Sequence, residues 1–198
     1  MKPQDFKSLI GHTDIYLIDQ ILKGTYQAGE KLLDAGCGYG RNLPWFIAND
    51  FDVHAVDLDS AMIAELHTKY PGLVGNIVHT DIDCLPFEDR YFDHVLCNAV
   101  LHFAEDTAHF KTMFSELVRV LNRLGTLFIR MTSNIGIESL VVPIFNGIYK
   151  LPDKSERFLL TRALLDEVME THNMSFFEPL KTVNVDHLRC MTTLVLRK

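Results

Sequence analysis

Residues 31–42 form a short apolar run that leads into three glycines at alternate positions, Lys31-Leu32-Leu33-Asp34-Ala35-Gly36-Cys37-Gly38-Tyr39-Gly40-Arg41-Asn42. Glycine permits positive φ and leaves no Cβ in the way of a ligand that approaches the main chain. A glycine-rich turn alone does not identify its ligand, since dinucleotide sites also use one. Asp34 narrows the choice, because a carboxylate there suits a ligand with positive charge and hydrogen-bond donors and repels a pyrophosphate.

Short apolar runs and helical patterns alternate outward from this turn. The predicted strands are residues 31–35, 51–57, 76–79, 92–97 and 126–130. Helical spacing of apolar residues predicts helices between the first two strands, over 15–22, over 110–121 and from Thr161 to Asn173. Residues 175–185 and 191–197 are predicted to pair as an antiparallel hairpin at the sheet edge. This alternation predicts an α/β fold with a doubly wound, mostly parallel sheet, whose ligand site lies at the carboxyl ends of the strands.

Composition and charge limit the class of protein. The chain has 198 residues and a net charge of −7, which predicts one domain over residues 1–198. No Lys/Arg cluster exceeds two residues, which argues against a nucleic-acid surface. No apolar run is long enough to cross a membrane, and the first residues lack a signal-peptide core, so we expect no membrane partner and a cytoplasmic location.

The four cysteines are far apart in the sequence and form no Cys-x-x-Cys pair. This spacing argues against a zinc site or a redox dithiol, and we expect no metal. Free cysteines are among the residues most often found inside proteins. We therefore expect reduced and mostly buried thiols at Cys37, Cys84, Cys97 and Cys190.

Polar residues follow the next three predicted strands. Asp57 lies where a doubly wound fold places the acid that binds ribose hydroxyls, although an acid at a strand end can equally cap the following helix, a role open to Asp59 as well. Asp81 can accept from an exocyclic amine while Ile82 packs on a flat ring; taken alone, Asp81 is an ordinary loop carboxylate. The backbone of Asn98, after the fourth strand, would border the same ligand.

Together these motifs resemble the class I methyltransferases that use S-adenosylmethionine, particularly the small single-domain bacterial type. The resemblance covers about residues 28–198 and rests on five motifs in order: 32–41, 55–59, 81–82, 87–93, and 116–121 before Gly125. It implies a seven-stranded sheet of order 3-2-1-4-5-7-6, with strand 7 antiparallel, flanked by helices. One departure is Asn122-Arg123-Leu124-Gly125, which replaces the Pro-Gly-Gly turn common before the fifth strand.

The resemblance also implies the cofactor, S-adenosyl-L-methionine, and the residues that bind it. Asp34 and Gly36 would lie near the methionine amino end, Asp57 would hold the ribose, and Asp81 with Ile82 would hold the adenine. The full predicted set is Asp34, Gly36, Gly38, Gly40, Arg41, Asp57, Leu58, Asp81, Ile82 and Asn98.

The methyl acceptor is less constrained by the sequence. Because a sulfonium is already a good methyl donor, alignment and exclusion of water suffice unless the nucleophile must lose a proton. The Asn/Asp-Pro-Pro-Tyr/Phe signature and a Pro-Cys dipeptide are both absent, so we expect a small-molecule acceptor. His102 is a candidate base, with a polar or helix-capping role as its alternative. Tyr16, Tyr39, Phe103 and Arg130 could also face the acceptor, whereas His54 and His94 are interpreted as structural.

Two segments are predicted to cover the acceptor. They are an N-terminal helical lid over residues 1–27 and an insertion over 134–156, for which an ordinary surface excursion is the alternative. The sequence leaves open the oligomeric state and a second function, a module that binds S-adenosylmethionine or S-adenosylhomocysteine without turnover. A nicotinamide-dependent oxidoreductase is disfavoured by Asp34 and by the hairpin ending.

Overall fold

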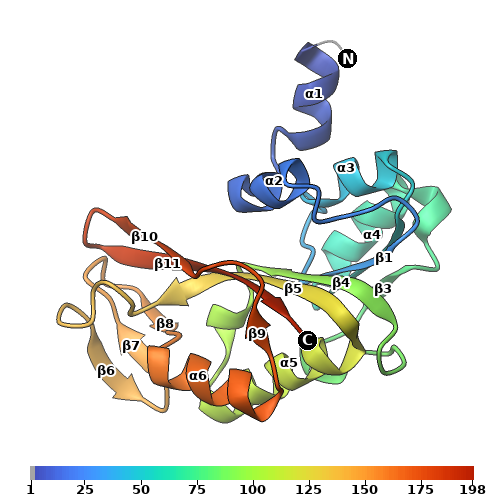
Figure 1. Ribbon diagram of the computed structural model, residues 1–198. Helices are drawn as coiled ribbons and strands as arrows, with labels where there is room; N and C mark the ends of the chain where they lie inside the picture. Colours follow the sequence, from blue (N-terminus) through green and yellow to red (C-terminus); the bar gives the residue numbers. More distant parts are fainter. Residues whose placement is uncertain (1–2) are drawn as a thin grey trace.

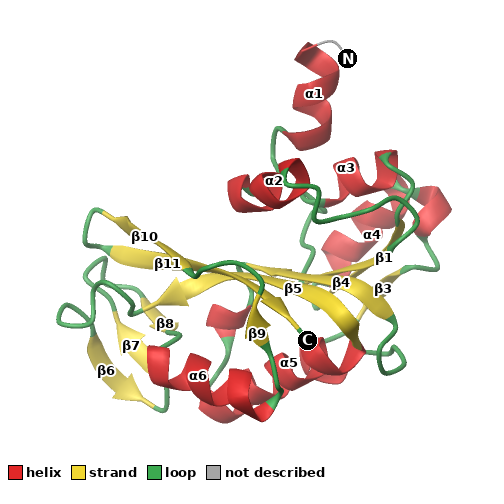
Figure 2. Ribbon diagram, viewed as in Figure 1, coloured by secondary structure: helices red, strands yellow, loops and turns green. Residues whose placement is uncertain are grey.

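The computed structural model describes residues 3–198, and its centre is a twisted sheet covered by helices on both faces (Figures 1 and 2). The principal strands run in the order β3-β2-β1-β4-β5-β11-β10, and β11 is antiparallel to β5. Their bounds are β1 Lys31–Ala35, β2 Asp52–Asp57, β3 Ile77–His79, β4 Phe92–Asn98, β5 Leu121–Ser133, β10 Lys181–Val185 and β11 Arg189–Arg197. With β10 as strand 6 and β11 as strand 7, this is the predicted order 3-2-1-4-5-7-6.

The two faces of the sheet hold separate apolar clusters. Helices α2 (Ile15–Leu22), α3 (Leu43–Ala48) and α4 (Ser60–Lys69) contribute to one cluster. The other contains residues of α5 (Thr107–Val120) and α6 (Arg162–Thr171). The predicted stripe of α5 is buried, and Thr161 caps α6 by accepting from the Leu164 amide. Short 3-10 turns, η1 (Pro71–Leu73), η2 (Ile82–Cys84) and η3 (Leu101–Phe103), complete the helical elements.

Helix α2 has the predicted extent, but its predicted apolar stripe, residues 15, 18, 21 and 22, is only partly buried. Ile15 and Leu22 are 70% and 78% exposed, whereas Leu17 and Gln20 are buried. Asp14 caps the helix by accepting from the Tyr16 amide, and its own amide donates to the Asn42 side chain. Helix α1 (Pro3–Ile10) projects from this side of the molecule, and its last residues, Leu9 and Ile10, line a small cavity with residues of α2 and α3 (Figure 1).

The end of the chain departs from the predicted hairpin in one respect. Residues 175–185 do not form one strand but divide into β9 (Ser175–Phe176) and β10, both of which pair with β11. Pro179 lies in the interruption, where it has no amide hydrogen to donate to a ladder. The β10–β11 turn has positive φ at both Asp186 and His187, as a tight hairpin of this hand requires.

Residues 122–125, which replace the Pro-Gly-Gly turn of the family pattern, lie inside strand β5 and distort it. The strand begins at Leu121, five positions before the predicted start, and its register with β4 shifts between Phe92 and His94. Leu124 has φ of 66°, and a Cβ on Gly125 would lie 2.7 Å from the Asp93 carbonyl oxygen. Glycine is needed at 125 because the two backbones meet there.

Residues 134–156 form most of a second, three-stranded antiparallel sheet, with β6 Val142–Phe145, β7 Ile148–Lys150 and β8 Glu156–Phe158. Asn146 and Gly147, both at positive φ, make the β6–β7 turn. The Asn146 carbonyl accepts from the Thr107 amide at 2.9 Å, and Phe158 stacks on Phe110. The insertion is therefore packed on the start of α5 rather than loose on the surface.

The structure tests the sequence-based expectations about membrane-spanning segments and about buried cysteines. Among residues 3–198, no helix is both long and apolar enough to span a membrane.

All four cysteines are free, and Cys37, Cys97 and Cys190 are buried as expected. Cys84 is exposed, because it ends the η2 turn in which Ile82 takes the buried position.

Candidate functional site

The glycine turn joins β1 to α3, and its glycines adopt positive φ angles. Gly36 and Gly38 have φ of 77° and 54°, and their amides donate to the Val56 carbonyl and to Asp57 Oδ2, respectively. A Cβ on Gly36 would lie 2.3 Å from a methyl carbon of Val100, inside van der Waals contact. The turn therefore requires glycine for its conformation and for the close approach of the chain after β4.

Asp57 and Asp59 have different partners at the end of β2. Asp57 accepts from the Gly38 amide at 2.7 Å and from the Asp59 amide at 2.9 Å. Asp59 is the cap of α4, accepting from the amides of Ala61 and Met62. The helix-capping alternative for Asp57 is therefore wrong, and each of its oxygens keeps a lone pair for a further donor.

A cavity of about 460 Å³ opens beside this turn. Six of the ten predicted cofactor residues line it: Gly36, Gly38, Asp57, Leu58, Asp81 and Ile82. Its remaining walls include Phe103, which the sequence suggested for the acceptor, and four side chains that the sequence did not suggest for either ligand, Met62, Val100, His109 and Met113. The cavity is thus apolar, with acids at the ends of β2 and β3.

Asp34 and Asn98 lie beside the cavity, at the ends of β1 and β4. Asp34 is 1% exposed and Asn98 6%. Because Asp34 pairs in register with Leu96, Asn98 two residues later points to the same side of the sheet. Among the described residues, neither carboxylate oxygen of Asp34 and neither polar side-chain atom of Asn98 has a hydrogen-bond partner. Burial raises the pKa of Asp34 to about 7, against smaller lowering effects of Arg41 and of the nearby Asn42 side chain.

These groups are suited to bind a polar ligand, because a buried polar group without a partner costs roughly 1–3 kcal/mol. The last two predicted residues lie outside the cavity lining. Gly40 packs against Leu66, and Arg41 is exposed, with its carbonyl facing the Thr13 hydroxyl at 3.3 Å.

Asp81, Asp83 and His109 bring possible metal-ligand atoms within 4.8 Å of one another at the rim of the cavity. Asp81 accepts from the Asp83 amide, and His109 Nδ1 accepts from the Glu105 amide. Both side chains therefore have local partners already, and nothing else in the described structure points to an ion there.

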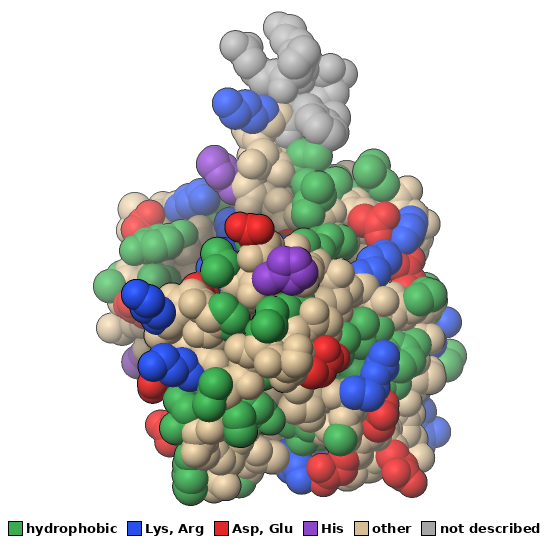
Figure 3. Space-filling model, turned by 90° about the vertical axis from the view of Figure 1, so that its left-hand side faces the viewer, with side chains coloured by type: hydrophobic (Ala, Val, Ile, Leu, Met, Phe, Trp, Pro, Cys, Tyr) green, Lys and Arg blue, Asp and Glu red, His purple; other side chains and the backbone are tan. Residues whose placement is uncertain are grey.

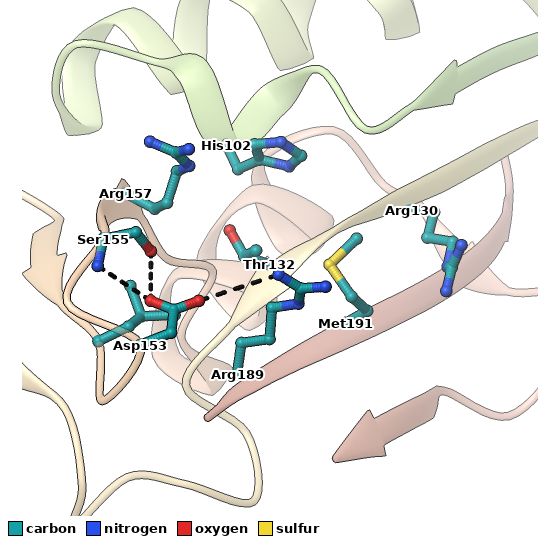
Figure 4. Close-up of a pocket in the computed structure, with 9 residues that line it drawn as sticks. His102, Arg130, Thr132, Asp153, Ser155, Arg157, Arg189 and Met191 are labelled. Atoms are coloured by element: carbon teal, nitrogen blue, oxygen red, sulfur yellow. Dashed lines mark hydrogen bonds and ion pairs between the residues drawn. The ribbon is translucent and has the colours of Figure 1, made fainter. Parts of the chain in front are cut away.

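A second cavity of about 400 Å³ lies across η3 from the first. His102 lines this cavity while the next residue, Phe103, lines the first. Three arginines line it, Arg130 from β5, Arg157 from β8 and Arg189 from β11, together with Asp153 and Ser155 of the insertion (Figure 4). The Arg157 guanidinium lies 5.7 Å from the centre of the Phe103 ring, so the two cavities adjoin.

His102 is buried, at 9% exposure, and its Nδ1 has no hydrogen-bond partner in the described part of the chain. Burial, with a smaller effect of Arg157, lowers the pKa of His102 to about 4. The side chain is therefore neutral at pH 7, but it is a weaker base than the ordinary histidine that the sequence suggested. It caps no helix.

The other residues that the sequence suggested near the acceptor lie in different places in the structure. Arg130 lines the second cavity, forms an ion pair with the buried Asp14, and has its guanidinium 5.2 Å from the Tyr16 ring. Phe103 lines the first cavity, and Tyr39 lines neither of the two. His94 bridges Thr126 and Glu30 at 2.7 Å each, and His54 packs among aromatic rings, as their structural interpretation predicts.

Comparison with known proteins matches part of the chain to a methyltransferase domain. Residues 33–129 match the family model of a methyltransferase domain. An uncharacterized methyltransferase of Mycobacterium tuberculosis is 31% identical over 123 residues, which cover 59% of this chain and 55% of that protein. This chain therefore spans about half the length of the curated relatives it matches.

Solved structures share the fold at low identity. An S-adenosylmethionine-dependent methyltransferase from Clostridium acetobutylicum matches with a TM-score of 0.71 at 14% identity, covering 98% of this chain and 96% of that one. The 1,6-didemethyltoxoflavin-N1-methyltransferase of Burkholderia thailandensis, solved with its substrate and S-adenosylhomocysteine, has a TM-score of 0.63 at 20% identity, covering 98% and 86%. Residues 33–129 therefore resemble a methyltransferase domain, and the chain shares the fold of S-adenosylmethionine-dependent methyltransferases.

Proposed function

We propose that the protein transfers a methyl group from S-adenosylmethionine to a small-molecule acceptor bound in the cavity beside His102. One observation carries this proposal: two cavities of similar volume adjoin across a single 3-10 turn, so that consecutive residues face different cavities. A methyltransferase needs such a pair of adjoining sites, because the donor and the nucleophile must meet in line while water is excluded.

The cofactor would occupy the cavity beside the glycine turn. Asp34 and Asn98, with their orphaned polar atoms, would receive the amino-acid end, and the glycine turn leaves room for it. Asp57 would accept from the ribose hydroxyls through its spare lone pairs. Asp81 would accept from the adenine amine, with Leu58 and Ile82 against the ring. Gly40 would support the turn and Arg41 the charge balance, since Arg41 acts to lower the pKa of Asp34.

The chemistry is divided between the cofactor and the protein. When bound, S-adenosylmethionine supplies an activated methyl group. The protein would align the acceptor by the walls of its cavity, which are mostly polar side chains, with Leu151 and Met191 as the apolar members. His102, neutral at pH 7, can accept a hydrogen bond from the acceptor, and the lowered pKa limits its power as a base.

A small acceptor fits the second cavity better than a polymer. Its volume is within the roughly 300–1,000 Å³ of small-molecule sites. On the face in Figure 3, Lys and Arg side chains lie in separate groups among Asp and Glu instead of forming one continuous basic surface. The insertion contributes Leu151, Asp153 and Ser155 to the cavity, which supports its predicted role at the acceptor side. On the N-terminal side, Asp14 forms an ion pair with Arg130, which lines the acceptor cavity. This contact supports the proposal that the N-terminal segment acts as a lid over the acceptor.

Two measurements test the proposal. Calorimetry should show binding of S-adenosylhomocysteine and none of NAD; the opposite result would overturn the cofactor assignment. Thiols, amines, phenols and carboxylates are then screened with methyl-labelled cofactor. Label transfer to a small molecule supports the enzyme, whereas cofactor binding without transfer to any acceptor would favour the non-catalytic binding module.

A further inference from the structure

The cavity beside His102 has the chemistry of an anion site. We propose that the acceptor carries a carboxylate or phosphate group, and that Arg157, assisted by Arg189, binds this group. The inference rests on the proposed function, because it assigns the substrate class of the same acceptor cavity.

The convergence of cations is the first observation. Residues 130, 157 and 189 belong to three separate strands, and the fold brings their guanidinium groups to one cavity. The chain as a whole has a net charge of −7, so a local excess of positive charge runs against its composition. Positive charge gathered in a concave site attracts anionic ligands and repels cationic ones.

The three arginines differ in the counter-charges they already have. Arg130 forms an ion pair with the buried Asp14, which holds it at the end of the cavity away from Arg157 (Figure 4). Arg189 lies 3.9 Å from Asp153, beyond hydrogen-bond distance. Asp153 accepts instead from the amide and hydroxyl of Ser155, at 2.9 and 2.6 Å.

Of the three arginines, Arg157 has the fewest interactions with negatively charged groups. Its Nη1 donates to the Glu156 carbonyl at 2.9 Å, and within residues 3–198 no ion pair of Arg157 is present. A guanidinium has five donors arranged in a fork that matches a carboxylate or a phosphate. Arg157 is exposed and Asp153 lies near enough to interact with its charge, but Arg157 keeps spare donors at the wall next to the cofactor cavity.

His102 supplies the second, independent observation. Its side chain lines the same cavity, is nine-tenths buried, and leaves Nδ1 without a partner in the described structure. Arg157 is close enough to disfavour the charged form of His102. An anion beside Arg157 would offset that repulsion, so one bound group would satisfy the cation and make the histidine a better base.

Matched pairs of small molecules test the inference by binding alone. Protein saturated with S-adenosylhomocysteine is titrated with carboxylic acids and their amides, and with phosphate monoesters and the corresponding alcohols. We expect the anions to bind more tightly than their neutral partners, and the two series distinguish a carboxylate site from a phosphate site. Equal binding of anionic and neutral members, or no binding of any anion, would overturn the inference.

Single-residue variants test whether Arg157 is the residue that binds the anion. Arg157→Met should weaken binding of the preferred anion roughly 10- to 100-fold, as expected for the loss of a charged hydrogen bond of about 1.5–3 kcal/mol. Arg157→Lys should recover part of the loss. Arg123→Met, which changes an exposed arginine that lines neither cavity, is the matched control. If Arg157→Met and Arg123→Met bind the anion alike, Arg157 is not the anion site.

The two proposals fail in different ways. If label transfer occurs to neutral acceptors and is unchanged in Arg157→Met, the methyltransferase function stands and the anion inference is wrong. If the anions bind through Arg157 but no acceptor is methylated, the anion site stands and the proposed function is wrong. Circular dichroism of each variant shows that a loss of binding is not a loss of folding.

Discussion

The two cavities are built in opposite ways. Most of the cofactor cavity comes from segments that follow strand ends within residues 36–113, each positioned by its own backbone. The acceptor cavity is made by side chains from η3, β5, the insertion and β11, over residues 102–191. Backbone-determined sites leave a motif in the sequence, whereas a cavity assembled from distant side chains leaves none. The first cavity is therefore readable from sequence, and the second requires the fold.

The largest expected effect is on the cofactor side, for Asp57→Ala. The change removes an acceptor for the ribose hydroxyls and also the partner of the Gly38 and Asp59 amides. We expect the affinity for S-adenosylhomocysteine, measured by calorimetry, to fall roughly 100-fold or more, since each charged hydrogen bond is worth about 1.5–3 kcal/mol. A folded variant that binds normally would remove Asp57 from the site.

His102→Ala tests the acceptor side, where we expect a smaller effect. A base with a pKa of about 4 is poorly matched to neutral pH, so the loss should appear mainly as an increase in acceptor KM of roughly tenfold. Binding of S-adenosylhomocysteine should be nearly unchanged. A fall in kcat of roughly 10²- to 10⁴-fold would instead show general-base catalysis, and wild-type kinetics would exclude His102 from the site.

Asp34 predicts a pH dependence of cofactor binding. Its raised pKa of about 7 means that the free protein holds a proton on Asp34 below that pH. A ligand ammonium favours the carboxylate, so affinity for S-adenosylhomocysteine should rise by about tenfold from about pH 6 to pH 8, with release of a proton. Asp34→Asn should bind more weakly and lose this dependence. A pH-independent affinity in the wild-type protein would place the amino group elsewhere.

Local spacing in the sequence predicts the glycine turn, the strands and the strand-end acids, whereas the sheet order is implied by the resemblance to class I methyltransferases. The sequence misses Arg157 by one residue, since the predicted insertion ends at 156 while β8 continues to Phe158. It misses Arg189 because the predicted last strand begins at Met191, two residues after β11 does. The Asn146-Gly147 pair was a usable signal, as it is the strongest short-range mark of a hairpin. By contrast, the burial of Leu17 and Gln20 on α2, with Ile15 and Leu22 exposed, is a tertiary arrangement that the apolar periodicity does not reveal.

The smallest expected effect separates two neighbouring acids at the cofactor side. Asp59→Ala removes the cap of α4, where the carboxylate accepts from the Ala61 amide at 2.8 Å. An exposed cap of this kind contributes about 1 kcal/mol to the free energy of unfolding, so Tm should fall by about 2–4 °C. The bond from the Asp59 amide to Asp57 uses the backbone and survives the change. The affinity for S-adenosylhomocysteine should therefore stay within about twofold of wild type. A loss comparable to that of Asp57→Ala would mean that the position of α4, rather than the Asp57 carboxylate, holds the ribose.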